Sequence, residues 1–109
     1  MKKILFLGCN FNQIPYLKVL KDKNFYVIGA DINLYAPGKI FCNKFYNVGY
    51  DDYKSIIEIG KKEDFISSDK VFTASAQFAH YTASLFAEFF KISYPKPEMI
   101  NFCLDKVSY

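Results

Sequence analysis

Seven residues in the segments that follow apolar runs of this sequence are candidates for contact with a small ligand. They have small or polar side chains and are Gly8, Cys9, Asn10, Gln13, Asp31, Ser75 and Gln77. A turn that leads into a helix offers backbone N–H groups and a helix dipole that favour an anion, and residues 8–13 have this form. The sequence contains no arginine, so an anion site here depends on such N–H groups or on lysine.

The loop over residues 8–13 matches the dinucleotide-binding pattern G-x-G-x-x-G only in part. Gly8 is present, but Asn10 and Gln13 stand where the pattern has its second and third glycines. The loop therefore either contacts a ligand or is only the turn that lets the next helix pack. Asp31 has a similar pair of interpretations, because its carboxylate can accept hydrogen bonds from a ribose or cap a turn.

The reactive side chains of the sequence do not form a recognisable catalytic set. Ser75 lacks the glycines of a nucleophile elbow and a base partner, so we favour a polar strand end that caps a helix at Gln77. The three cysteines, at positions 9, 42 and 103, have no C-x-x-C spacing and are expected to be reduced thiols rather than a disulfide framework or a zinc site. We therefore predict no catalytic residue and no metal ligand in this chain.

Composition excludes several classes of function. About half of the residues are hydrophobic (51%), as in globular domains, and the net charge is only +3. The lysines are spread along the chain without forming a stripe, so nucleic acid is not an expected partner. The apolar run from Ile4 to Leu7 is too short for a signal peptide or a membrane span. We expect a cytoplasmic protein that does not associate with membranes.

Alternating strand and helix patterns must position the candidate residues. Continuous apolar runs predict buried strands over 3–7 and 25–30, and shorter runs predict strands over 45–48, 70–74 and 91–94. Helical spacing predicts helices over 13–23, after the aspartates at 51 and 52, and over 77–90, the last largely buried. The fold class is thus Rossmann-like α/β in three layers, with a parallel sheet of four to five strands, in the order 3-2-1-4. Ligands bind at the carboxyl ends of the strands in such sheets.

The order and spacing of several segments resemble a known family. The segments are Lys3–Gly8, Gln13–Pro15, Val27–Asp31, Ala36–Gly38, Asn43–Tyr46 and Asp105–Ser108. Over essentially its whole length the sequence resembles the N-terminal preATP-grasp domain of ATP-grasp enzymes, such as carbamoyl-phosphate synthase large subunits, biotin carboxylases and amino-acid ligases. Its first loop has fewer glycines than the loop of many members.

The resemblance implies a domain over residues 1–94 and, over 95–109, the start of a linker helix into an ATP-grasp domain that this sequence lacks. In the biotin-carboxylase-like branch an Asp-Lys pair supplies a lysine to the nucleotide phosphates, and Asp105-Lys106 looks like that pair. The parent enzyme would use ATP and magnesium to convert a carboxylate or bicarbonate into an acyl phosphate, which an amine then attacks.

The same resemblance sets expectations for the chain alone. We expect a substrate-framing domain of a carboxylate-amine ligase, or of a carbamoyl-phosphate synthase-like ligase, that is truncated, inactive by itself and without a bound cofactor. Its partners would be the missing ATP-grasp domain and the small carboxylate or bicarbonate. Exposed apolar helix faces would also allow a homo-oligomer.

Two other classes of function remain open. One is a small nicotinamide-nucleotide-binding oxidoreductase domain, which Asp31 and the strand-loop-helix start support and the missing glycines oppose. The other is a non-catalytic interaction module of flavodoxin-like topology.

Overall fold

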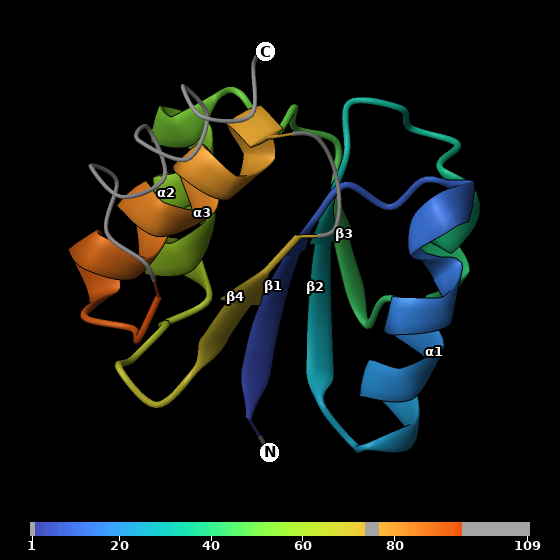
Figure 1. Ribbon diagram of the computed structural model, residues 1–109, viewed down its shortest axis with the longest axis horizontal. Coiled ribbons are helices and arrows are strands. Elements are labelled where there is room, and N and C mark those ends of the chain that lie inside the picture. The colour runs from blue at the N-terminus through green and yellow to red at the C-terminus, as the bar shows by residue number, and fades with distance from the viewer. Residues whose placement is uncertain (1, 74–76, 95–109) are drawn as a thin grey trace, which may run out of the picture.

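A parallel sheet of four strands organises the part of the chain that the structure, a computed structural model, describes, residues 2–73 and 77–94. The strands are β1 (Lys3–Leu7), β2 (Tyr26–Ala30), β3 (Lys44–Tyr46) and β4 (Lys70–Phe72). They are parallel and lie in the order β3-β2-β1-β4, as Figure 1 shows. The predicted fold class and strand order are confirmed.

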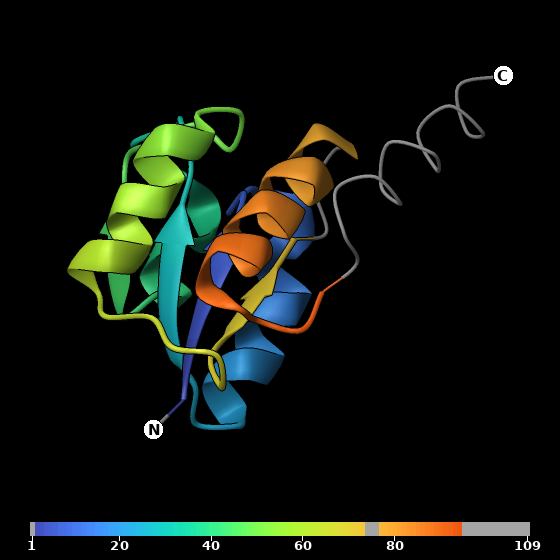
Figure 2. The ribbon, with the colours of Figure 1, turned by 90° about the vertical axis from the view of Figure 1, so that its left-hand side faces the viewer.

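Helices cover both faces of this sheet. The 3-10 helix η1 (Phe11–Gln13) runs into α1 (Ile14–Asp22), and a second 3-10 helix, η2 (Pro37–Phe41), precedes β3. On the other face lie α2 (Tyr53–Lys62) and α3 (Gln77–Phe90), which Figure 2 shows in front of the sheet with α1 behind it. Local signals set the helix ends: Asn24, just after α1, adopts a left-handed φ of 66°, and the Asp52 side chain caps α2.

Alternation of side chains along the central strands creates two cores. Leu5, Leu7 and Ile28 point toward α2 and α3 and pack with side chains such as Phe86. Their neighbours in sequence point toward α1, where the second core contains Ile4, Phe6, Cys9, Leu17, Val27 and Ala36. Because β1 and β2 are buried on both faces, their sequences are continuously apolar.

Three sequence predictions need correction. The third strand spans Lys44–Tyr46 and not residues 45–48. It starts earlier than predicted because the chain already pairs with β2 at Asn43, whose N–H donates to the Val27 carbonyl. It ends at Tyr46 because the Val48 N–H turns back to the Tyr46 carbonyl. No strand forms over residues 91–94: Lys91 has a φ of 62°, and the Ile92 N–H bonds to the Ala87 carbonyl to close the end of α3.

The third correction concerns the burial of α3. Its alanines and Phe86 are buried as expected, but the Phe78 and Phe89 side chains are about half exposed. Phe89 lies near the end of α2, where the Lys61 ammonium is 5.3 Å from its ring centroid. One face of α3 therefore meets solvent in the described part of the chain.

Candidate functional site

The carboxyl ends of the parallel strands lie at the same end of the sheet, where the sequence predicts the ligand site. Leu7 lies opposite Ala30, and Ala30 lies opposite Tyr46. On the other side of β1, β4 ends at Phe72, and the next hydroxyl, on Thr73, donates to the Leu7 carbonyl at 2.7 Å. The loops that follow these strands therefore start side by side.

Gly8 makes the turn that opens the first loop. Its φ is 88°, a left-handed value that glycine adopts without strain, and its N–H donates to the Ala30 carbonyl at 2.8 Å. The chain then passes through Cys9, which is completely buried against the α1 face of the sheet. The start of the loop is thus anchored to the end of β2.

Asp31 holds two loops together through both of its carboxylate oxygens. One oxygen accepts the Cys9 N–H at 2.7 Å, and the other accepts the Asn33 N–H at 2.8 Å. The Asn47 side chain, after β3, donates to the carbonyls of Asp31 and Ile32 at 3.0 and 2.8 Å. The turn-capping interpretation of Asp31 is therefore realised, and it extends to a link between the loops after β1, β2 and β3.

Most backbone donors of the first loop already have protein acceptors. The Asn12 N–H bonds to the Asn10 side chain, the Gln13 N–H to the Asn10 carbonyl, and the Ile14 N–H to the Phe11 carbonyl. The donors of Gly8 and Cys9 are used as described above. A phosphate cradle needs such N–H groups free to face the ligand. This loop is therefore a poor equivalent of the dinucleotide-binding loop.

The remaining candidate residues are placed only in part. Asn10 is exposed at the start of η1, whereas Gln13 is 3% exposed and belongs to the interior of the loop. Gln77 is the first residue of α3, the helix that follows β4. Ser75 and Lys106 lie outside the described residues, so their roles stay predictions. The structure therefore brings together Gly8, Cys9 and Asp31 from the predicted set.

Sequence reasoning missed the partner of Cys9. The Sγ atom of Cys42, at the end of η2, lies 4.0 Å from the Sγ atom of Cys9. A Cβ atom at Gly29 would lie 2.5 Å from the Cys42 sulfur and 2.8 Å from the Cys9 sulfur, so this glycine makes room for both thiols. Its position one residue before the end of a buried strand was the available signal, but the 33-residue separation concealed the pair.

A charged cluster ties β3 to the end of α2. The Tyr46 hydroxyl donates to the Glu63 carboxylate, which also accepts from the Lys44 ammonium at 3.2 Å. Burial by itself would raise the pKa of Glu63, but the hydrogen bonds from Tyr46 and Lys44 outweigh it and hold that pKa below its usual value. The cluster is structural, since it fastens a short edge strand to the helix above it.

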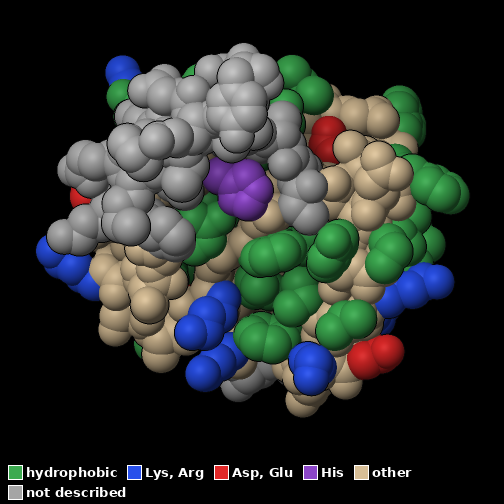
Figure 3. Space-filling view, in the orientation of Figure 1, with side chains coloured by type: hydrophobic (Ala, Val, Ile, Leu, Met, Phe, Trp, Pro, Cys, Tyr) green, Lys and Arg blue, Asp and Glu red, His purple; other side chains and the backbone are tan. Residues whose placement is uncertain are grey.

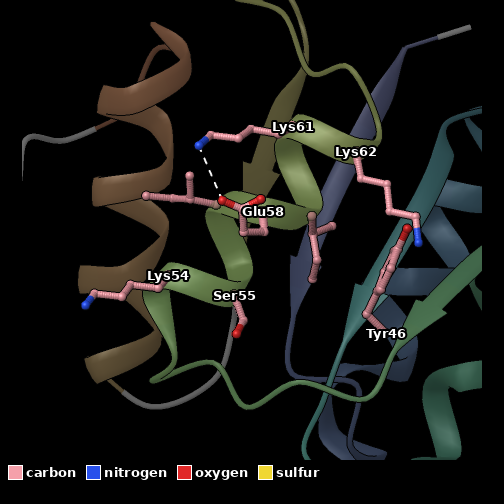
Figure 4. A pocket seen from close by; sticks show the side chains of 8 residues that line it. Tyr46, Lys54, Ser55, Glu58, Lys61 and Lys62 are labelled. Atoms are coloured by element: carbon pink, nitrogen blue, oxygen red, sulfur yellow. Dashed lines mark hydrogen bonds and ion pairs between the residues drawn. The ribbon is translucent and has the colours of Figure 1, made fainter.

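A shallow hollow of about 500 Å³ runs along α2 and is shown in Figure 4. The Lys62 ammonium lies over the Tyr46 ring on one side, and Glu58 pairs with Lys61 at 3.3 Å on the other. None of the candidate ligand residues lines it. We read this hollow as the solvated flank of a surface helix.

The described residues offer neither a metal-binding cluster nor a membrane-spanning helix. Within residues 2–73 and 77–94, no three histidine, cysteine or acidic side chains gather closely enough to hold a metal ion. Over the same residues, no helix has the length and apolar character that a bilayer crossing requires.

The sheet order, the helices on both faces and the cluster of polar strand ends define a Rossmann-like α/β domain with the preATP-grasp fold, as the sequence predicted. Among solved structures, this chain is similar to phosphoribosylglycinamide synthetase from Anaerococcus prevotii, with 15% identity and a TM-score of 0.81 over 96% of this chain and 26% of that one. No protein-family model matches the sequence, and no curated protein matches it.

Two further synthetases share the fold. N5-carboxyaminoimidazole ribonucleotide synthetase from Thermotoga maritima is 24% identical, with a TM-score of 0.70 over 94% of this chain and 27% of its own. N5-carboxyaminoimidazole synthetase from Staphylococcus aureus, solved with ADP, is 17% identical, with a TM-score of 0.66 over 91% of this chain and 25% of its own. The chain spans about a quarter of the length of these solved proteins.

Proposed function

We propose that this chain is the substrate-framing domain of an ATP-dependent carboxylate-amine ligase of the ATP-grasp class. One observation carries the proposal: nearly the whole chain superposes on a quarter of three solved synthetases. Because a fold can serve many chemistries, the sequence resemblance and the linked strand-end loops are needed as well. The activity belongs to the longer protein, and this domain contributes the walls of the acceptor site.

In this proposal Asp31 is a positioning residue for the acceptor site. Its two hydrogen bonds fix the loops after β1 and β2 relative to each other, which leaves the exposed Asn10 and the turn at Gly8 beside the strand ends. Cys9 and Gln13 support this loop from the interior. Ser75 and Gln77 would complete the site from the β4 side and contact a small carboxylate or bicarbonate.

ATP and magnesium would be held mainly by the rest of the enzyme. Lys106 is the one residue of this chain that we assign to the nucleotide, as a positive charge beside its phosphates. The chain by itself should not bind ATP tightly.

We propose that an apolar groove is where the rest of the polypeptide packs. It lies between α1 and the edge strand β4 and is lined by Ile4, Pro15, Tyr16, Val19, Leu20, Phe25, Lys70, Val71 and Phe72. Figure 3 shows hydrophobic side chains gathered on the face that contains this groove. The helix α1 covers the β1 and β2 part of this face, and β4 lies beyond it. A further element of the same polypeptide would cover the groove.

The test begins with the coding sequence beyond Tyr109. We expect it to continue with a glycine-rich loop, a paired lysine and a Glu-x-Asn magnesium site. The full protein should then release phosphate from ATP when magnesium and its carboxylate or bicarbonate acceptor are present. A reading frame without an ATP-binding domain, or a full protein with no acceptor-dependent phosphate release, would overturn the proposal.

The nucleotide assignment has a matched control in the same segment of sequence. Lys106→Met should weaken ATP binding by the full protein by roughly tenfold or more, because a charge-assisted contact to phosphate is lost. Lys96→Met removes the same charge ten positions earlier and should leave ATP affinity unchanged. Equal effects of the two substitutions would reject the assignment of Lys106.

The oxidoreductase alternative gains no support from the first loop. Most N–H groups of this loop are engaged by protein acceptors, and the Asp31 carboxylate that a ribose would need already accepts the Cys9 and Asn33 N–H groups. Saturable enhancement of NADH fluorescence by the chain would restore that alternative.

A further inference from the structure

Cys9 and Cys42 come from different loops and meet at the candidate site. Their sulfur atoms are 4.0 Å apart. Cys9 is fully buried just after β1, and Cys42 is half-buried just after η2. The two thiols are thus close together, and only one of them faces solvent in part.

The backbone around the pair is held by hydrogen bonds on both sides. Asp31 accepts the Cys9 N–H at 2.7 Å, and the Gly38 N–H donates to the Cys9 carbonyl at 2.8 Å. The Cys42 N–H closes the end of η2 on the Lys39 carbonyl at 3.0 Å. Gly29 lies beneath both sulfurs without a side chain, so they can approach each other there. The proximity is therefore built into the fold.

The two thiols are not equivalent. The hydrogen bond with Cys42, together with burial, raises the pKa of Cys9 far above its usual value. The same hydrogen bond, now with Cys42 as acceptor, lowers the pKa of Cys42 against the effect of burial, and the charge of Lys21 adds to this. A thiolate is the nucleophile in thiol–disulfide exchange, so Cys42 is the thiol that reacts first.

We propose that Cys9 and Cys42 form a redox-active dithiol that reacts with low-molecular-weight disulfides, with Cys42 as the attacking thiol and Cys9 as the resolving thiol. The Cys42 thiolate attacks one sulfur of the disulfide and releases one thiolate, leaving a mixed disulfide. Cys9 then gives up its proton, attacks the Cys42 sulfur and expels the second thiolate. The two protein thiols are oxidised to one disulfide, and the small disulfide is reduced to two thiols.

Oxidation would join the loop after β1 to the end of η2 by a covalent bond. Asp31 already joins the loop after β1 to the start of the loop after β2, which contains η2, through its hydrogen bonds. The bond would therefore fix the edge of the candidate site. This inference does not depend on the proposed ligase function, because it rests only on the two thiols and their surroundings.

The experiment uses the chain with Cys103→Ser, which leaves the proposed pair as its two cysteines. The folded protein is incubated with oxidised glutathione, quenched with an alkylating reagent and weighed by mass spectrometry. We expect loss of two hydrogens without added glutathione or alkyl groups, and a Cys9–Cys42 cross-link after proteolysis. Two alkylated thiols, or glutathione adducts that persist, would overturn the proposal.

Single variants in this background test the order of attack. With Cys9→Ala, Cys42 should take up one glutathione and keep it, since no resolving thiol remains. With Cys42→Ala, the buried Cys9 should stay unmodified. Circular dichroism establishes that each variant is folded before its modification by glutathione is measured. Modification of Cys9 with Cys42 left free would contradict the assigned roles.

A comparison with the unfolded chain tests whether the fold creates the reactivity. In urea, the two cysteines lie 33 positions apart in a flexible chain. The folded Cys103→Ser chain should form the disulfide at least roughly tenfold faster than the same chain in urea, because its sulfurs are held in reach. Equal or slower oxidation of the folded chain would show that the observed proximity is not used.

Discussion

Asp31 illustrates how one side chain at a strand end can serve structure and site together. A carboxylate has two oxygens and about four lone pairs, so accepting from Cys9 and Asn33 does not exhaust it. These two hydrogen bonds are structural, and contact with a ligand would add to them. Substitution at this residue should therefore affect the loops first.

Asp31→Ala should lower the free energy of unfolding by about 1–3 kcal/mol, because two backbone donors lose their acceptor. Faster hydrogen exchange at the Cys9 and Asn33 amides should accompany the loss. Asp51→Ala removes an exposed carboxylate and should change stability by less than about 0.5 kcal/mol. Unchanged exchange at both amides in Asp31→Ala would contradict the loop-linking role.

Glu63 makes the stability of the domain depend on acid. In the folded state the pKa of Glu63 lies below its usual value. Its contribution to the free energy of unfolding is therefore fully present at pH values above the usual pKa, and it is lost as pH falls through the lowered pKa. Tyr46→Phe removes one donor, which should cost about 1–1.5 kcal/mol at neutral pH. The cost should shrink as Glu63 becomes protonated.

Chemical denaturation of Tyr46→Phe and the parent chain between neutral pH and about pH 3 measures this difference. Tyr53→Phe, which changes a tyrosine on α2 that is 44% exposed, is the matched control. A Tyr46→Phe cost that stays constant over the whole range would show that the hydrogen bond to Glu63 is not its source.

At the scale of elements, close approach between β2 and the end of η2 depends on Gly29. An alanine in a strand is normally tolerated better than glycine, but here the added carbon would meet the two thiol sulfurs. Both atoms belong to packed side chains with little room to withdraw. The strand and the loop are therefore matched to each other at this point.

Gly29→Ala should destabilise the chain by about 1–3 kcal/mol, as overpacking of a core does. Adding Cys42→Ala removes the nearer sulfur and should recover part of the loss in a double-mutant cycle. Gly49→Ala, where the nearest atom is the movable end of the Asp51 side chain, is the control and should be nearly neutral. Strictly additive effects of the two changes would rule out the contact as the cause.

For the whole molecule, the groove beside β4 is the main apolar surface that the described residues leave uncovered. Val19, on its α1 side, is 51% exposed, and Tyr16 and Phe72 are also partly exposed. The proposed ligase function accounts for such a face, because a further domain would cover it. The groove and the site edge are different surfaces and can be tested separately.

Val19→Lys should change the stability of the 109-residue chain by less than about 0.5 kcal/mol, since the side chain is already half exposed. In the full protein it should lower the unfolding temperature, because a charge is buried against the covering element. Ile66→Lys, at an exposed position outside the groove, is the control and should affect neither protein. If the short chain is instead a dimer that Val19→Lys dissociates, a second copy covers the groove.

The sequence by itself determined the parallel α/β fold, its strand order and the edge at which the candidate loops meet. Continuous apolar runs and helical spacing are local patterns, and the rules of strand connection turn them into a small number of topologies. Glycine at position 8 and aspartate at position 31 could be singled out because each follows directly from a predicted strand.

Only the tertiary structure decided what those residues do. The approach of Cys42 to Cys9, the engagement of the first loop's N–H groups and the half-exposed rings of α3 depend on contacts between distant segments. The absence of a strand over residues 91–94 has the same origin, because a left-handed Lys91 and the burial of Ile92 override a short apolar pattern. Local patterns specify which face of an element is buried, whereas the partner on that face is chosen by packing in three dimensions.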